Sequence, residues 1–473
     1  MTNRRNFIRN ITSLAASVIF LPYCKASDKE RSGVMEGEEW KDDKGKRLNG
    51  TGTYVLTEDL EKTTQDSIEK HRMGDFIIRL CDADDQPLIG VDALIELIEH
   101  EFDWGISSAG SICDTNPKAV LQAAHIRELF NCTTAKCYWD EGWHQPIEKI
   151  EGKRIRDKFV DEINWGLANG LRVKGHPLVW TVRKAIPTWM DKYSYSEQMR
   201  FLEEHVRDLI RTGGHGVGQW DLCNEMLWEP SLRNLSERNW PHIETIDEIL
   251  TYLEPAVHWA KEENPYAIYA LNDYGLVKTN APGVTSAQQR QRYVALIKEM
   301  RRRGCAPDAL GTQCHVAGWY TAEEFVQMLD ELSEAGLPIQ VTEFWAKLKD
   351  YPFDKDPDGE HAEGDLIRYV TMIYTLAFAH PQVSHFTYWG GGDWFDGYGE
   401  PNQLYHAIRQ LIRNEWFTKK TITSNSEGEL KIKAFYGNYW ISLRDKQGNH
   451  YSQTIHLAKG SGGVVKVNLP IHR

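Results

Sequence analysis

Gly218-Gln219-Trp220-Asp221-Leu222-Cys223-Asn224-Glu225 has the composition of a buried strand that ends in an amide and a carboxylate. A strand is stiff, so two polar side chains at its C-terminal end can be aimed at a ligand. An Asn-Glu pair alone is common and specifies nothing. Its meaning depends on whether the chain supplies a second carboxylate and a scaffold that brings the two together.

Short apolar runs alternate with segments of helical period on both sides of this strand, a pattern typical of a parallel sheet built from strand–helix units. The predicted strands are Phe102–Ser108, Cys132–Trp139, Leu171–Trp180, Val217–Glu225, Ala267–Asp273, Ala309–Val316, Pro338–Trp345 and Val383–Gly390. Apolar residues recur at helical spacing in Lys153–Asn169 and Thr321–Ala335. Eight such units predict a (β/α)8 TIM barrel over residues 102–416. An open doubly wound sheet is the alternative, but Gly105–Gly110 lacks its glycine-rich phosphate turn.

The N-terminal residues predict a targeting segment. Arg4-Arg5 precedes a short apolar run, so residues 1–26 are interpreted as a signal peptide of the twin-arginine type. This predicts export to the periplasm or the cell exterior. A lipid anchor on Cys24 is the alternative to simple cleavage.

Three further segments flank or precede the predicted barrel. Residues 27–52 are polar and charged and predict a linker. Residues 53–101 predict a small β-rich module, and residues 417–473 predict a second, antiparallel one.

The composition narrows the classes of function. A net charge of −13 over 473 residues argues against nucleic-acid binding and against an anionic membrane surface. Eight cysteines without a Cys-x-x-Cys spacing do not predict a disulfide framework, although a single bridge stays open. No His-Glu-x-x-His motif occurs, and neither a metal nor a cofactor is predicted. The sequence does not indicate an oligomeric state.

Polar and aromatic side chains lie at or just beyond the C-terminal ends of the predicted barrel strands, which share one mouth in a TIM barrel. They are His176, Trp180, Asn224, Glu225, Asn272, Asp273, Gln313, His315, Glu343, Trp345, Trp389, Asp393 and Trp394. Any single one is explained as a solvated loop residue or a helix cap. Together they predict a ligand site, because polar groups at the ends of apolar strands need partners.

Two carboxylates in one mouth are what cleavage of a glycosidic bond requires: one protonated to serve the leaving oxygen, one ionised to attack or to activate water. Glu225 and Glu343 end the fourth and seventh strands and are the predicted pair. Asn224 is expected to hold a sugar hydroxyl, His315 to donate to Glu343, and Trp389 to form a floor under the sugar ring.

These motifs resemble glycoside hydrolase family 10, whose usual members are endo-β-1,4-xylanases. Gly175–Trp180 resembles the family's G-H-T-L-V-W, Trp220–Glu225 its W-D-V-V-N-E, and Ile339–Glu343 its I-Q-I-T-E. Shorter matches to its N-D-Y, Q-S-H and F-W-G motifs begin at Asn272, Gln313 and Tyr388, respectively. The resemblance implies hydrolysis of internal xylan linkages with retention, with Glu343 as nucleophile and Glu225 as acid/base. The expected substrate-binding residues are His176, Trp180, Asn224, Gln313, His315, Trp389, Trp394 and Lys136.

The sequence departs from the family pattern around the glycone sugar. Thr181 and Arg183 stand where the family has His and Gln, and Lys136 offers its amine in a shifted position. Trp345 replaces an Asp after the nucleophile. Xylan is therefore the expected polysaccharide, with a different plant or microbial glycan as one alternative and a non-catalytic sugar-binding barrel as another.

Two signals outside the catalytic pair have competing interpretations. Arg183 either meets an acidic sugar substituent or is solvated, and the second is favoured. Asp354–Gly359 with Asp365 partly matches a calcium loop, but Pro357 is unusual inside one, so an ordinary acidic surface loop is favoured.

Overall fold

The structure is a computed structural model, and it describes residues 56–107, 116–139, 150–229, 231–234, 240–315, 318–348, 360–445, 448–460 and 464–471. The predicted signal peptide (1–26), the linker (27–52), Cys24 and the loop Asp354–Gly359 lie outside the described residues. The predictions made for them stay predictions.

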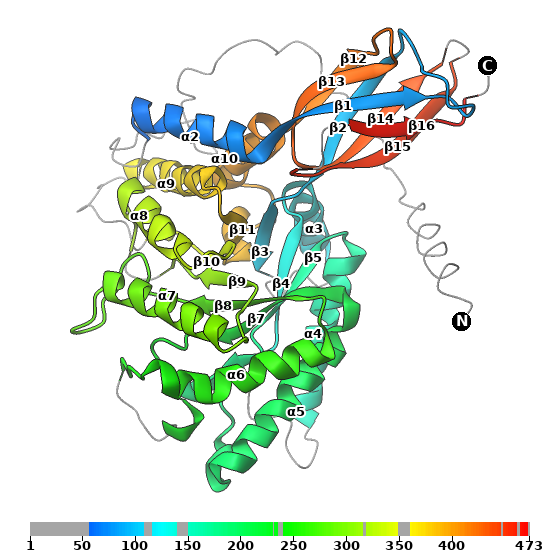
Figure 1. Cartoon of the computed structure of the whole chain (residues 1–473). Coiled ribbons are helices and arrows are strands. Elements are labelled where there is room, and N and C mark those ends of the chain that lie inside the picture. Colours follow the sequence, from blue (N-terminus) through cyan, green and yellow to red (C-terminus); the bar gives the residue numbers. More distant parts are fainter. Residues whose placement is uncertain are drawn as a thin grey trace, which may run out of the picture. The chain divides into compact units, whose positions relative to one another are not determined.

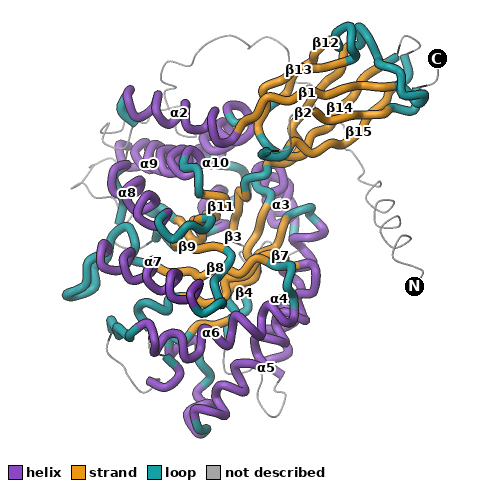
Figure 2. The backbone as a smooth tube through the Cα atoms, in the orientation of Figure 1, coloured by secondary structure: helices purple, strands orange, loops and turns teal. Residues whose placement is uncertain are grey.

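Parallel strands close into a barrel, and helices pack around it (Figures 1 and 2). The strands are β3 (Asp103–Ser107), β4 (Cys132–Lys136), β5 (Arg172–His176), β6 (Val179–Trp180), β7 (Val217–Asn224), β8 (Ile268–Asp273), β9 (Ala309–Thr312), β10 (Ile339–Phe344) and β11 (Val383–Tyr388). Pairing of β5 with β7 and of β11 with β3 closes the ring, and the two-residue β6 runs beside the end of β7. The (β/α)8 prediction is confirmed, and the open doubly wound sheet is excluded.

The helices of the barrel region begin at residues that the sequence marks. They are α3 (Pro117–Leu129), α4 (Ile150–Ala168), α5 (Tyr195–Gly213), α6 (Ile246–Glu263), α7 (Ser286–Arg302), α8 (Ala322–Ser333), α9 (Glu360–Ala379) and α10 (Gln403–Gln410). Thr245, Thr285 and Thr321 each cap the helix that follows them, with a Glu or Gln at the third position completing a capping box. Because each cap is worth about 1 kcal/mol, these residues fix where the loop after a strand stops.

The two ends of the described chain form one β domain rather than two separate modules. The first end supplies β1 (Met73–Cys81) and β2 (Asp92–His100). The second end supplies β12 (Lys419–Thr423), β13 (Glu429–Phe435), β14 (Gly437–Arg444), β15 (His450–Leu457) and β16 (Val464–Asn468). The sheets have the orders β13-β1-β16 and β12-β2-β14-β15.

This arrangement corrects the prediction of separate modules at 53–101 and 417–473. β1 and β2 lie inside their sheets, so each needs partners on both edges, and only the C-terminal strands provide them. The second module is not purely antiparallel either, because β16 runs parallel to β1. Helix α2 (Glu58–Arg72), which precedes β1, was not predicted.

Arg72, at the end of α2, ties the β domain to the base of the barrel. Its guanidinium donates to the carbonyls of Phe378 at 2.5 Å, His380 at 2.6 Å and Val383 at 2.7 Å. These carbonyls lie at and just beyond the end of α9, where a helix leaves its last acceptors unsatisfied. Arg72 therefore acts as a cap supplied from another element.

The described cysteines are buried free thiols: Cys81, Cys132, Cys137, Cys223, Cys305 and Cys314. This agrees with the prediction that the chain has no disulfide framework, as far as the described residues go. In the same part of the chain, no helix combines the length and the apolar character needed to cross a membrane.

Candidate active site

Glu225 follows the last residue of β7 in an unusual backbone conformation. Its φ of +61° lies in the left-handed region, which a non-glycine residue adopts at a cost. The N–H of Glu225 donates to the carbonyl of Asn272 at 2.8 Å, which holds the turn against β8. Backbone strain of this kind clusters at functional sites.

The Glu225 carboxylate accepts hydrogen bonds from two predicted site residues. Trp180 Nε1 donates to Oε2 at 2.8 Å, and Gln313 Nε2 donates to Oε1 at 3.3 Å. Burial raises the pKa of Glu225, and the negative charge of Glu343 raises it further, which outweighs both donors. A raised pKa suits a general acid.

Glu343 lies on β10 and has the opposite electrostatic environment. Asn272 Nδ2 donates to its Oε1 at 2.7 Å, and His315 Nε2 lies 3.4 Å from its Oε2. Burial alone would raise the pKa of Glu343, but the interaction with His315 and the charges of His176 and His315 outweigh it and lower the pKa. The carboxylate is thus kept ionised, as a nucleophile requires.

Three buried amides join the two carboxylates. Gln313 Nε2 and Asn272 Nδ2 both donate to Asn224 Oδ1, at 3.0 and 2.9 Å. Gln313 also reaches Glu225, and Asn272 also reaches Glu343. The predicted role of Asn224 is narrowed, because its amide oxygen is occupied and only its NH2 group is left for a sugar hydroxyl.

The predicted substrate-binding residues His176, Trp389 and Lys136 come together beside Glu343. Lys136 Nζ lies 4.5 Å from the ring centre of Trp389, and the His176 ring lies 5.2 Å from the same indole. His176 Nε2 is 3.9 Å from Glu343 Oε1. Since Trp389 is only partly buried, its ring is available to a sugar.

Trp394 does not belong with these residues. The sequence predicts a substrate contact, but the indole is 0% exposed and packs on Tyr388 and Phe130, with ring centres 4.7 and 5.3 Å apart. The short helical turn Gly391–Trp394 after β11 directs the ring into the core. Arg183 pairs with Asp191 at 2.8 Å and its side chain is only 24% exposed, so it is a partly buried ion-pair partner rather than the freely solvated residue that was favoured.

Sequence reasoning missed two groups beside Glu225. Burial and the charge of Glu225 raise the pKa of Glu229 to about 7, while the charge of Lys184 lowers it. Lys184 Nζ also lies 4.8 Å from the ring centre of Trp180. Glu229 lies in the turn after β7, where its N–H donates to the Glu225 carbonyl at 3.2 Å, and its closeness to Glu225 in sequence was a signal that it shares the mouth.

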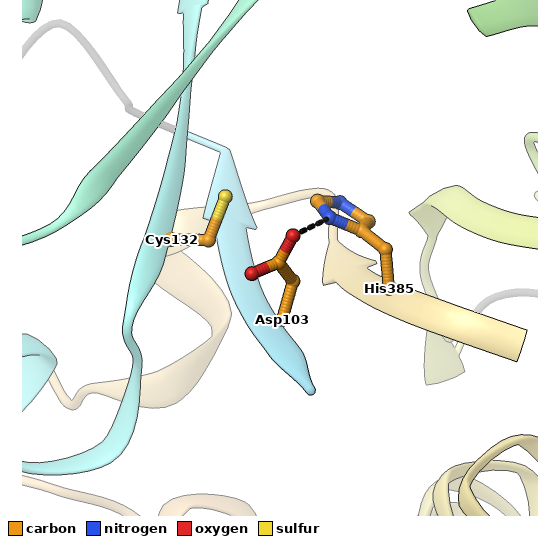
Figure 3. Close-up of side chains that lie close together, drawn as sticks. All are labelled: Asp103, Cys132 and His385. Carbon is orange, nitrogen blue, oxygen red and sulfur yellow. Dashed lines mark hydrogen bonds and ion pairs between the residues drawn. The ribbon is translucent and has the colours of Figure 1, made fainter. Parts of the chain in front are cut away.

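A second cluster of polar groups, drawn in Figure 3, lies at the opposite end of the barrel, where β3 begins at Asp103 and β4 at Cys132. Asp103, Cys132 and His385 are buried and within ligand distance of one another. The carboxylate and the imidazole already have partners: Asp103 pairs with Arg172 at 2.9 Å and accepts from Gln219 at 2.5 Å, and His385 Nε2 contacts Thr387 Oγ1 at 2.7 Å. Because a cation and a donor already occupy the carboxylate, hydrogen bonding accounts for this cluster without a metal.

Taken together, the mouth presents one carboxyl group with a raised pKa and one with a lowered pKa, joined by a rigid amide bridge. In such a pair, the carboxyl group with the raised pKa can protonate a leaving group. The other can attack the carbon atom from which that group departs. A partly exposed tryptophan and a lysine lie beside the attacking group.

Comparisons with known proteins agree with this chemistry. The model of the family described as Glycosyl hydrolase family 10 matches residues 144–404, more than half of the chain. The chain is 28% identical over 291 residues to endo-1,4-beta-xylanase B of Thermotoga neapolitana, covering 57% of this chain and 78% of that protein. It is 25% identical over 409 residues to anti-sigma-I factor RsgI6 of Acetivibrio thermocellus, covering 84% of this chain but only 48% of that relative.

Solved structures show the same fold. Xylanase 10B of Thermotoga petrophila RKU-1, in complex with xylobiose, superposes with a TM-score of 0.52 at 20% identity, over 67% of this chain and 95% of that one. A thermostable mutant of the xylanase Xyn10A of Cellvibrio japonicus gives 0.53 at 18% identity, over 66% and 97%. At these identities the likeness shows the fold alone.

Proposed function

The chain belongs to glycosyl hydrolase family 10, and from that premise we propose that it is a retaining endo-1,4-β-xylanase. The observation that carries the proposal is the pair Glu225 and Glu343, whose environments push their pKa values in opposite directions. Endo-xylanases among the similar proteins support xylan as the substrate.

Membership of the family and the lowered pKa of Glu343 support a double displacement. Glu225, protonated, gives its proton to the glycosidic oxygen while ionised Glu343 attacks the anomeric carbon, so the bond to the leaving sugar breaks and an ester to Glu343 forms. Glu225, now ionised, then takes a proton from water, and the resulting hydroxide attacks the same carbon and releases Glu343. Trp180 and Gln313 hold Glu225 in place for both proton transfers.

Hydrolysis of xylan by the purified chain tests the proposal, with reducing ends and product lengths measured over time. Internal cleavage predicts a spread of oligosaccharides at early times. Glu343→Gln and Glu225→Gln should each slow release by at least about 10²-fold. Trp240→Phe, a change at a half-exposed indole that donates a hydrogen bond to Tyr274, serves as a folded control. Near wild-type release by either carboxyl variant would contradict the proposal.

A different β-linked glycan is the second candidate substrate, and the position of Lys136 favours it. Its amine lies over Trp389 in the expected glycone position, and Lys136 and Thr181 both depart from the family pattern in the sequence. A panel of xylans, arabinans and β-glucans separates the candidates. If reducing ends are released faster from another glycan than from xylan, that glycan is the substrate.

A binding role without turnover is the third candidate. It is favoured by the similarity of 84% of the chain to a protein named as an anti-sigma factor rather than as an enzyme. Thermal shift with xylo-oligosaccharides on Glu225→Gln measures binding alone. Binding without hydrolysis by the wild type would establish this candidate.

We also propose that the chain is exported, from the Arg4-Arg5 pair and the apolar residues 11–23. Expression in a bacterium should yield a processed protein outside the cytoplasm, and Arg4→Lys with Arg5→Lys should retain it inside. Incorporation of labelled palmitate that disappears in Cys24→Ala would identify a lipid anchor instead.

A further inference from the structure

The two histidines beside Glu343, His315 and His176, are oriented by different contacts. His315 packs against the ring of Trp345 at 4.9 Å, and among the described residues its ion-pair partner is Glu343 alone. His176 has a second carboxylate: its Nδ1 lies 2.8 Å from Asp221 Oδ2, while its Nε2 faces Glu343. A histidine whose Nδ1 hydrogen is held by a carboxylate has a fixed ring orientation.

Asp221 is itself held by a buried cation. Lys174 Nζ lies 2.7 Å from Asp221 Oδ1, and the two side chains are 1% and 2% exposed. Lys174 also donates to Gln340 Oε1 at 2.7 Å. Burying this ion pair carries a large desolvation cost, and an apolar pair of similar size would often be as stable. Stability alone therefore does not explain the pair.

The contacts continue along the inside of the barrel to its base. Gln340 Nε2 donates to Gln219 at 2.9 Å, and Gln219 donates to Asp103, which pairs with Arg172. A second acid–cation pair, formed by buried Asp103 and partly exposed Arg172, thus lies on the same line of contacts. Only Asp221 touches a histidine that faces the nucleophile.

We propose that Asp221 and Lys174 are positioning residues for the nucleophile: they hold His176 so that its Nε2 faces Glu343 Oε1. Asp221 fixes the orientation of the His176 ring through a hydrogen bond. The His315 ring has no such carboxylate partner among the described residues apart from Glu343 itself, and it packs against Trp345 instead. This inference rests on the proposed function, because it concerns the same reaction.

The contact between Asp221 and His176 should affect how the reaction rate depends on pH, because His176 acts on the pKa of Glu343. That charge lowers the pKa of Glu343, whereas the more distant charge of Asp221 raises it to a smaller extent. Loss of the Asp221 carboxylate removes the contact that orients the His176 ring toward Glu343, so His176 should lower the pKa of Glu343 less and that pKa should rise. In the described part of the chain, the other titratable groups that face Glu343 are His315, Glu225, Lys136 and Tyr138.

Asp221→Asn tests the proposal, with Asp103→Asn as a matched control that changes the other buried acid on the same line. Both variants are expected to lose thermal stability, because each leaves a cation with a neutral partner. Kinetics on an aryl β-xylobioside are measured from pH 4 to 9. For Asp221→Asn we expect kcat to fall about 10²-fold, KM to change little, and the acid limb of kcat/KM to move to higher pH.

Asp103→Asn should keep kcat within threefold of the wild type and leave the acid limb in place. Equal kinetic losses in the two variants, or a folded Asp221→Asn with wild-type kcat and acid limb, would overturn the proposal. If Asp221→Asn does not fold, Lys174→Met replaces it, with the same direction expected and wild-type kcat as the contrary result. A wild type without activity on any glycan would instead refute the proposed function.

Discussion

Each end of the barrel holds a buried carboxylate beside a histidine, but the two ends differ in what else the carboxylate meets. At the base, both carboxylate oxygens of Asp103 already have partners, Arg172 and Gln219, and the neighbouring His385 is 0% exposed. At the mouth, Glu343 faces a second carboxyl group with a raised pKa, beside His315 at 18% exposure. A buried acid–histidine pair alone is therefore structural; opposed protonation states and an open approach make it reactive.

Glu343→Gln should have the largest effect. The amide cannot form the covalent ester, so kcat should fall by at least about 10⁴-fold on xylan and on an aryl β-xylobioside alike. Initial rates on both substrates check this. Retained activity on the aryl substrate alone would mean that Glu343 is the proton donor instead.

Glu225→Ala should separate the two substrates. Loss of the general acid should slow xylan hydrolysis by about 10²–10⁴-fold, whereas an aryl group that leaves without protonation should still be released in the first step. Added azide should restore turnover and give a β-glycosyl azide, which NMR identifies. An α-azide, or equal losses on both substrates, would not fit the assignment.

Trp180→Phe should have a smaller effect, because one hydrogen bond is lost while the carboxyl group stays. kcat/KM should fall by less than about tenfold. The indole N–H favours the ionised form of Glu225, so its removal should raise the pKa of Glu225. Glu225 then stays protonated to higher pH, and the alkaline limb of kcat/KM should move up. A downward move would show that the N–H does not act on this carboxylate.

Arg172→Met, at the base, should change stability without changing kcat. Asp103 loses its cation, at a cost of about 1–3 kcal/mol. Burial raises the pKa of Asp103, but His385 and Arg172 outweigh it and lower the pKa, so the ion pair stabilises the fold above the unfolded pKa of about 4 and less as pH falls. The gap in Tm between wild type and variant should therefore shrink below pH 4, as calorimetry can measure. A loss of kcat in this variant would contradict the view that the acid–histidine pair at the base is structural and only the one at the mouth is reactive.

The sequence alone predicts the barrel well, because strand ends and helix caps are local signals. It also predicts Glu225 and Glu343, since residues at the ends of parallel strands share one mouth. Trp394 was placed wrongly because three glycines precede it, and they leave the direction of the following ring open.

Partners across the barrel were beyond sequence reasoning. Lys174 and Asp221 alternate with apolar neighbours on their strands, and this period shows that they point inward. The same period does not show that they meet, because the register between strands is set by the closed sheet. The single β domain was missed for the same reason, as its strands β1 and β13 pair across 350 to 362 residues.

Covalent trapping of the enzyme settles the roles of the two carboxylates. The wild type is incubated with a 2-deoxy-2-fluoro-β-xylobioside that carries a good leaving group, then digested and analysed by peptide mass spectrometry. We predict one glycosyl adduct, on the peptide that contains Glu343. An adduct on Glu225, or full hydrolytic activity with no adduct, would contradict the assignment of Glu343 as the nucleophile.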